Sequence, residues 1–293
     1  MTGMVKITQS NRRGAGKAFA ATAAAMAAAV VFAGCSSGSD SSDTKTDGAG
    51  SSSNLVIGSD LTYPPYTYLS NDKPAGFDID IVTALAKEMD VKPTFKDTRF
   101  EQLIPSINSG QIQLIASALY ITAERAQQVD YIPYFSTGNS IIVKDGSKSY
   151  ADAASLCGVS VGVIKGAAAA QSMRGESSDK CKADGKKAID VREFNTDPEA
   201  TQAVLSGAVK AEVTDAAVAG SLVKKMDGRV KITSSALLYP VPVGLAVKKG
   251  NADLKKKVED ALAALQKNGA YDKLLKEYNL EPVNQDEVDA ILK

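Results

Sequence analysis

SALYITAER, residues 117–125, joins an apolar run to a segment with the features of a helix start. The apolar run, residues 112–116, predicts a buried strand. Thr122 is suited to cap a helix, and Glu124 falls in the first turn, where a carboxylate complements the helix dipole. A strand end that feeds a helix start offers free backbone N–H groups, so Arg125 beside them indicates a carboxylate receptor. An ordinary salt bridge of Arg125 on a helix face is the alternative, and these residues alone leave both open.

The N-terminal part of the chain has the pattern of an export signal. An uncharged, Ala-rich run at residues 18–33 follows four basic residues, Lys6, Arg12, Arg13 and Lys17. The run is shorter than the roughly 20 residues that a membrane-spanning helix needs. It therefore predicts a cleavable signal over residues 1–34. Phe-Ala-Gly-Cys at residues 32–35 resembles the lipobox of bacterial lipoproteins, which implies that Cys35 is lipidated.

Residues 35–53 are rich in Ser, Gly and Asp and predict a flexible tether. With the preceding signal, the tether predicts a protein held on the outer face of the cell membrane by its N-terminal lipid alone. The chain has 293 residues, so 293 − 53 = 240 remain after the tether. That length is enough for two modest domains.

Composition excludes several classes of function. Lys plus Arg and Asp plus Glu both number 34, so no excess charge favours nucleic acid. The sequence contains no histidine, which removes His-based catalytic triads and imidazole metal ligands. We expect no metal, no cofactor and no catalytic residue. Cys157 and Cys181 are the cysteines left after Cys35, and an even remainder in an exported chain indicates a disulfide, with two free thiols as the alternative.

Strand and helix patterns alternate along the chain, which predicts an α/β fold with mainly parallel sheets. The aromatic segment at residues 131–138 is interpreted as irregular and as a crossing between lobes. Tyr239-Pro240 is interpreted as a second crossing. The predicted domains are a discontinuous lobe of residues 54–138 plus 240–293 and an inserted lobe of residues 139–239.

Four acidic residues stand at expected helix starts. Asp78 and Asp80 precede the apolar face of a helix predicted over residues 76–89, where capping and hydrogen bonding are favoured over catalysis. Asp197, followed by Pro198, is interpreted as the N-cap of the next long helix. Asp215 closes a predicted strand and is expected to cap the helix that follows it.

A known family is recognisable in these segments. Residues 76–81, GFDIDI, with Leu85-Ala86 and Met89 at the right spacing, match the signature of the family 3 solute-binding proteins of ABC transporters, which bind polar amino acids. Four further pieces fit in the expected order: Gly58-Ser59-Asp60 with Tyr63, Ile121-Thr122 with Glu124-Arg125, Val161-Gly162-Val163 with Gly166, and Asn268-Gly269-Ala270-Tyr271 with Leu274. The resemblance spans residues 55–280. It implies a type II periplasmic-binding-protein fold, with two lobes joined by two hinge strands.

The resemblance also implies roles for matching residues. Arg125 is expected to bind the ligand α-carboxylate bidentately, and Asp215 to accept the α-ammonium from the other lobe. Tyr63 and Phe100 are expected to enclose the ligand side chain. The other positions expected in the ligand site are Asp60, Ser117, Ala118, Tyr120, Ala167 and Ala168.

We therefore expect a monomeric binding protein that delivers a polar or basic amino acid, or a similar zwitterion, to an ABC permease. Tyr120 stands where many relatives carry Ser or Thr, which leaves the ligand open. A binder of a compact zwitterion such as ectoine is one alternative. A cyclohexadienyl-dehydratase-like enzyme and a sensor module that signals to a kinase are two others.

Overall fold

The structure is a computed structural model that describes residues 54–293. The expected signal segment, Cys35 and the expected tether lie outside the described residues. Within residues 54–293, no helix combines the length and the apolar character that crossing a bilayer requires.

One nine-stranded sheet organises this part of the chain, in the order β5-β1-β6-β12-β7-β10-β8-β9, with β11 paired to β7. The strands are β1 (Asn54–Ser59), β5 (Lys92–Asp97), β6 (Leu114–Ile115), β7 (Val129–Lys144), β8 (Ser160–Ile164), β9 (Asp190–Phe194), β10 (Ala211–Asp215), β11 (Val230–Ile232) and β12 (Leu238–Lys248). β1 pairs in parallel with β5 and β6, and β8 pairs in parallel with β9 and β10. β7 and β12 are antiparallel to their neighbours.

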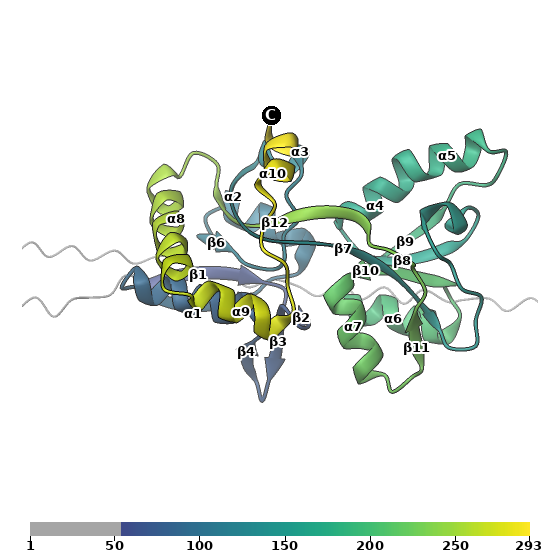
Figure 1. Ribbon diagram of the computed structural model, residues 1–293, viewed down its shortest axis with the longest axis horizontal. Helices are drawn as coiled ribbons and strands as arrows, with labels where there is room; N and C mark the ends of the chain where they lie inside the picture. The colour runs from purple at the N-terminus through teal and green to yellow at the C-terminus, as the bar shows by residue number, and fades with distance from the viewer. Residues whose placement is uncertain (1–53) are drawn as a thin grey trace, which may run out of the picture. The chain divides into compact units, whose positions relative to one another are not determined.

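The interpretation of residues 131–138 as irregular is wrong. These residues belong to β7, which pairs with β12 from Val129, opposite Lys248, to Asn139, opposite Leu238. β12 supplies hydrogen-bond partners along this length, and register shifts absorb the irregularity. The two strands run side by side between the two halves of the fold and join what the sequence predicts as two sheets into one (Figure 1).

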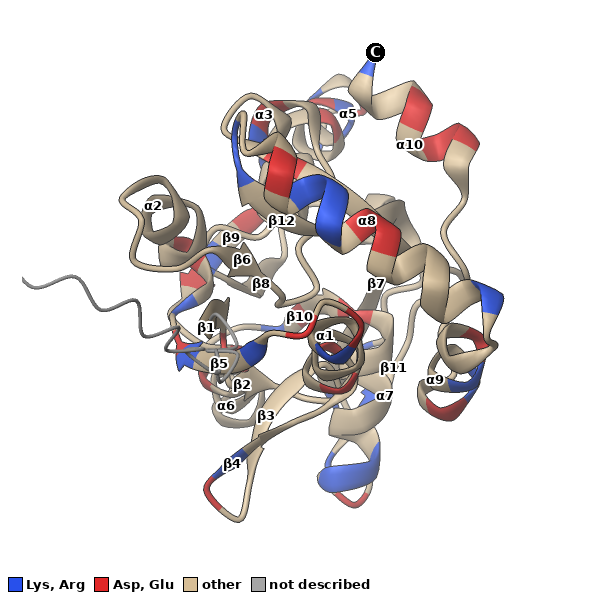
Figure 2. Ribbon diagram, turned by 90° about the vertical axis from the view of Figure 1, so that its left-hand side faces the viewer, with Lys and Arg blue, Asp and Glu red and all other residues tan. Residues whose placement is uncertain are grey.

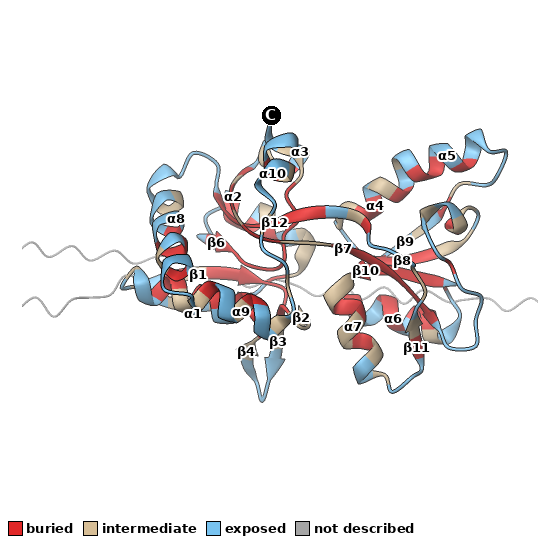
Figure 3. Ribbon diagram, viewed as in Figure 1, coloured by how far each residue is buried: buried red, intermediate tan, exposed pale blue. Residues whose placement is uncertain are grey.

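The helices are α1 (Phe77–Glu88), α2 (Leu103–Asn108), α3 (Ala123–Ala126), α4 (Ala168–Ser172), α5 (Ser178–Ala183), α6 (Asp197–Ser206), α7 (Ala216–Lys225), α8 (Ala252–Lys267), α9 (Ala270–Tyr278) and α10 (Gln285–Leu292). They flank the buried strands and turn exposed faces outward (Figure 3). In α8, Val258, Leu262 and Leu265 are buried, while charges of both signs alternate on the outer face (Figure 2). The α/β class is confirmed, but the prediction of mainly parallel sheets is wrong. Four strand pairs of the large sheet within residues 54–293 are parallel and four are antiparallel, because β7 and β12 run against their neighbours.

Two groups of elements form the two lobes. We call the part with β1, β5, β6, α1, α8 and α9 the first lobe, and the part with β8, β9, β10 and α4 to α7 the second lobe. Ile57, Ile81 and Leu262 share one core cluster, and Val161 and Val213 share another. The α7 residues Val218 and Leu222 pack into the first cluster, so α7 contacts both lobes. The residue bounds of the lobes stay a prediction.

The helix caps follow the sequence only in part. The side chains of Thr122 and Asp215 cap α3 and α7, as predicted. Asp78 does not cap α1, because it lies inside the first turn after Gly76 and its carboxylate accepts hydrogen bonds from other elements instead. Asp197 is also inside its helix, and the hydroxyl of Thr196 caps α6. Both carboxylates are buried and serve tertiary contacts.

A small sheet precedes α1. It consists of β2 (Thr62–Tyr63), β3 (Thr67–Ser70) and β4 (Lys73–Ala75). Asn71 and Asp72 form the turn between β3 and β4, and both have positive φ, as a tight hairpin favours. In the second lobe, Cys157 and Cys181 form the predicted disulfide.

Candidate functional site

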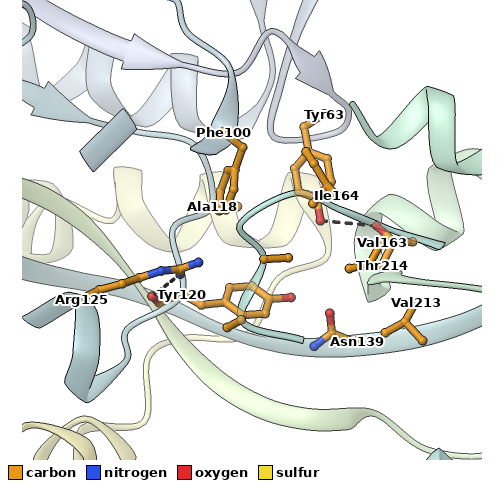
Figure 4. Close-up of a pocket in the computed structure, with 12 residues that line it drawn as sticks. Tyr63, Phe100, Ala118, Tyr120, Arg125, Asn139, Val163, Ile164, Val213 and Thr214 are labelled. Atoms are coloured by element: carbon orange, nitrogen blue, oxygen red, sulfur yellow. Dashed lines mark hydrogen bonds between the residues drawn. The ribbon is translucent and has the colours of Figure 1, made fainter. Parts of the chain in front are cut away.

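A small cavity lies between the lobes, at the carboxyl ends of the parallel strands (Figure 4). Its volume of about 20 Å³ has room for about one water molecule. The residues that line it are Tyr63, Phe100, Ala118, Tyr120 and Arg125 on one side, and Asn139, Val163, Ile164, Ala167, Ala168, Val213 and Thr214 on the other. Ligands of α/β proteins bind at this edge of the sheet.

Arg125 is fixed at the cavity wall by its own helix start. The Thr122 hydroxyl accepts from the backbone N–H of Arg125 at 3.2 Å, which sets the first turn of α3. The guanidinium carbon stands 5.5 Å from the centre of the Phe100 ring, a cation–π distance. Burial lowers the pKa of Arg125, yet a guanidinium keeps its charge in proteins.

The guanidinium of Arg125 makes two hydrogen bonds to backbone carbonyls. It donates from Nη1 to the oxygen of Tyr120 at 2.8 Å and from Nη2 to the oxygen of Gly166 at 2.8 Å. Gly166 has a φ of +80°, a conformation that favours glycine and directs this carbonyl. A guanidinium has five N–H donors, so two carbonyls do not exhaust it. Arg125 therefore retains capacity for a bidentate carboxylate.

Asp215 is the opposite charge of the site, but it does not line the cavity. Its Oδ1 accepts from the Tyr66 hydroxyl at 2.8 Å and from the N–H of Ala217 at 2.8 Å. Its Oδ2 accepts from the Tyr120 hydroxyl at 2.8 Å and from the Thr137 hydroxyl at 2.9 Å. Burial raises the pKa of the Asp215 carboxyl, and these hydrogen bonds oppose the rise.

Tyr120 connects the two charged ends of the site. Its carbonyl accepts from Arg125, and its hydroxyl donates to Asp215. The ring points from the Arg125 side toward the wall that carries Asn139 (Figure 4). Asn139 and Asp215 are cross-strand partners of β7 and β10, so the ring covers the Asp215 end of the cavity.

Asp60 and Ser117 also lie behind the cavity wall. Asp60 Oδ1 forms an ion pair with Arg99 at 2.9 Å, and its Oδ2 accepts from the N–H of Phe100 at 2.9 Å. The Ser117 hydroxyl accepts from the N–H of Asp60 at 3.0 Å. Both side chains thus support the segment that presents Phe100. A direct ligand contact for either stays a prediction.

The predicted set omits five residues of the cavity wall, namely Asn139, Val163, Ile164, Val213 and Thr214. Four of them close β8 and β10 in the second lobe. The signal that could have found them is their place at the carboxyl ends of parallel strands, the edge where ligands bind. Asn139 lacked such a signal because its segment was interpreted as a crossing.

Polar contacts at the rim hold the lobes together. Lys165 and Glu101 form an ion pair at 2.7 Å, and Gln171 donates to Glu124 at 2.8 Å. Both pairs join an element of one lobe to an element of the other. An arginine on the first lobe and an aspartate on the second, with a cavity between them, define a two-lobed solute-binding protein that encloses its ligand.

The comparisons with known proteins agree with this class. Residues 55–281 match the model of the bacterial extracellular solute-binding proteins, family 3, and the chain belongs to this family. The chain is 31% identical to the L-cystine-binding protein TcyJ of Escherichia coli (strain K12), over 73% of this chain and 78% of that protein. It is 30% identical to the L-arginine-binding protein of Pseudomonas aeruginosa, over 76% and 86% respectively.

Solved structures show the same fold. An ancestral arginine-binding protein bound to glutamine superposes with a TM-score of 0.69 and 38% identity, covering 77% of this chain and 97% of that chain. The ancestral amino-acid-binding protein AncCDT-1, a precursor of cyclohexadienyl dehydratase, has a TM-score of 0.65 and 31% identity, covering 77% and 95%. The type II periplasmic-binding fold that the sequence predicts is confirmed.

Proposed function

We propose that this protein captures a polar or basic amino acid outside the cytoplasm and delivers it to the permease of an ABC importer. The observation that carries the proposal is the buried pair of opposite charges on the two lobes, with Arg125 in the cavity wall and Asp215 behind the ring of Tyr120. Stripping water from a zwitterion costs free energy unless each of its charges finds a partner. Family membership and the relatives named for cystine and arginine support the same proposal.

Each pole of the ligand has a proposed partner. Arg125 offers a planar fork that matches the α-carboxylate, and Asp215 is the anionic group for the α-ammonium. Tyr63 and Phe100 line the same cavity and are proposed to enclose the side chain. An apolar wall from the second lobe completes the enclosure.

Capture requires the lobes to part. The cavity of about 20 Å³ is far smaller than the several hundred Å³ of a typical ligand pocket, so an amino acid enters only after the cavity widens. The cross-lobe contacts of Lys165 with Glu101 and of Arg125 with Gly166 would break on opening. Closure around a ligand then gives the permease a shape to recognise.

Isothermal titration calorimetry of the purified protein with L-arginine, L-glutamine and L-cystine tests the proposal. At least one of them is expected to bind, and the same ligand is expected to lose most of its affinity for the Arg125→Ala variant. If none of the twenty standard amino acids nor L-cystine binds, amino-acid capture is the wrong function.

The location is part of the proposal. Residues 1–34 are proposed to direct export, and Cys35 to carry the lipid that anchors a monomer to the outer face of the membrane. Cys35→Ser is expected to release the protein from washed membranes into the soluble fraction. Retention of the variant on membranes would contradict the anchor.

A lyase activity on the same fold is the second candidate, because the structural neighbour AncCDT-1 is described as a precursor of cyclohexadienyl dehydratase. An enzyme needs a general base within reach of its substrate. Asp215 is covered by Tyr120 and already accepts several hydrogen bonds, so we propose a binding protein and not an enzyme. Turnover of prephenate or arogenate by the purified protein would favour the enzyme.

A further inference from the structure

The Asp215 carboxylate has no vacant acceptor position. A carboxylate offers about four lone-pair directions. Four close donors already fill them: the hydroxyls of Tyr66, Tyr120 and Thr137, and the N–H of Ala217, at 2.8 to 2.9 Å. A ligand ammonium would be a fifth close donor. It reaches Asp215 with good geometry only if one of the four leaves.

Three of the four donors are held in place by the fold. The Ala217 N–H belongs to the capped first turn of α7, and Thr137 belongs to β7, where it pairs with Val241 of β12. The Tyr66 ring is fully buried and stacks against Tyr63 and Phe135, with centroid distances of 6.1 and 5.3 Å. None of these three lines the cavity.

Tyr120 differs from these three donors in its place at the cavity. Its ring lines the cavity, and its hydroxyl crosses from the first lobe to Asp215 on the second. Within residues 54–293, the one further acceptor of this hydroxyl is the carbonyl of Gly138, at a marginal 3.4 Å. The Tyr120 hydroxyl is therefore the one donor that can be exchanged for a group arriving in the cavity.

We propose that the Tyr120 hydroxyl occupies the position of the ligand ammonium on Asp215 and is displaced by it, so that Tyr120 sets the affinity for ammonium-bearing ligands. This inference rests on the proposed function and adds a specificity residue to it. When a ligand ammonium binds Asp215, the hydrogen bond from the Tyr120 hydroxyl to Asp215 is lost and one from the ammonium is gained. A hydrogen bond to a charged group is stronger than one between neutral groups, so losing it on exchange weakens ligand binding.

The test is Tyr120→Phe, which removes the competing hydroxyl and keeps the ring. Affinities are measured by titration calorimetry for L-arginine, L-glutamine and L-cystine. Each is paired with an analogue that lacks the ammonium: 5-guanidinopentanoate, glutaramate and 3,3′-dithiodipropionate. The variant is expected to bind the amino acid about tenfold more tightly than wild type. Its affinity for the paired analogue is expected to stay unchanged, because that ligand displaces no donor.

Two control variants separate displacement from a general effect of losing a phenol. Tyr278→Phe removes a phenol that also donates to a carboxylate, Asp80, within the first lobe. Tyr66→Phe removes the other phenol on Asp215, whose ring stays packed outside the cavity. Tyr278→Phe is expected to leave affinity unchanged, and Tyr66→Phe is expected not to tighten binding.

The outcomes distinguish the two claims. If wild type binds an amino acid and Tyr120→Phe binds it equally or more weakly, the hydroxyl stays in place beside the ammonium and the displacement inference is wrong. If the variant binds both the amino acid and its analogue more tightly than wild type does, Tyr120 acts through lobe closure and the inference is also wrong. If neither wild type nor any variant binds an amino acid, the proposed function fails first.

Discussion

The two charged ends of the site are built in opposite ways. Arg125 lines the cavity, and its contacts there are with two carbonyl oxygens and the face of Phe100. Asp215 is withdrawn from the cavity and surrounded by donors from both lobes. The Arg125 end therefore keeps unused N–H donors at the cavity, as the proposed carboxylate role requires, whereas the hydrogen-bond acceptors of Asp215 are filled by the protein itself.

This difference follows from what each charge needs when it is buried. A guanidinium spreads its charge over five N–H donors and stacks on an aromatic ring. It can therefore be buried with some of its donors lacking an acceptor. A buried carboxylate is costly unless its lone pairs are filled. On the proposed displacement, the hydrogen bonds to Asp215 stabilise the closed arrangement and weaken ligand binding. The two ends of the site can be tested separately.

The largest effect is expected at the Arg125 end. Arg125→Ala should weaken binding of the amino-acid ligand by about 4 kcal/mol, on the order of a thousandfold, because the ligand carboxylate is left buried without its partner. Titration calorimetry measures it. Arg174→Ala is the matched control, since Arg174 pairs with Glu193 on the surface of the second lobe. Equal affinity of Arg125→Ala and wild type would remove the carboxylate role.

The second effect concerns the stability of the lobe that carries Asp215. The Cys157–Cys181 disulfide spans 24 residues of sequence, and chain entropy gives about 3 kcal/mol for a loop of this length. Replacing both cysteines by Ser should lower the free energy of urea unfolding by about that amount. Ligand affinity of the folded variant should not change, since neither cysteine lines the cavity. An unchanged urea midpoint would contradict this expectation.

A smaller effect is expected at the Asp215 end. Asp215→Asn keeps the shape and removes the charge, and should weaken amino-acid binding by about 2 kcal/mol, less than the loss of Arg125. The analogue without an ammonium should bind the variant as it binds wild type. Asp80→Asn is the control, because Asp80 also accepts from a tyrosine hydroxyl but lies away from the cavity. A loss as large as that of Arg125→Ala would show that the two ends do not differ in the proposed way.

A last effect depends on pH and concerns Asp78, beneath the cavity wall. Its carboxyl accepts from the N–H of Ala118 and the hydroxyl of Tyr134, both at 2.6 Å. Burial raises the pKa of Asp78 from 3.8 to about 7. The folded state therefore holds this proton more tightly than the unfolded state, and stability is lost as pH rises from about 4 to about 7.

Asp78→Asn carries no such proton and should not show this loss. Between pH 5 and pH 8, the free energy of unfolding of the variant should rise by about 2 to 3 kcal/mol relative to that of wild type, as measured by urea unfolding. Asp80→Asn, an exposed position on the same helix, is the matched control variant. A constant difference between Asp78→Asn and wild type at both pH values would mean that Asp78 stays ionised in the folded protein.

Local patterns in the sequence predicted most of the elements of the fold. The Thr122 cap and the Asp215 cap need only nearby residues, and both are present. Residues 131–138 were misinterpreted because their strand character depends on pairing with β12, more than a hundred positions away. The residues near Asp78 in the sequence also could not show that its carboxylate accepts hydrogen bonds from Ala118 and Tyr134 instead of capping its own helix.

The same division holds at the site. The sequence by itself determined the family signature, the two charges Arg125 and Asp215, and the unusual Tyr120. Only the tertiary structure decided that the Tyr120 hydroxyl reaches Asp215, 95 positions away, and covers it. The physical reason is that residue type fixes which charges a site can hold, whereas the packing of two lobes fixes which of their hydrogen-bond positions remain open to a ligand.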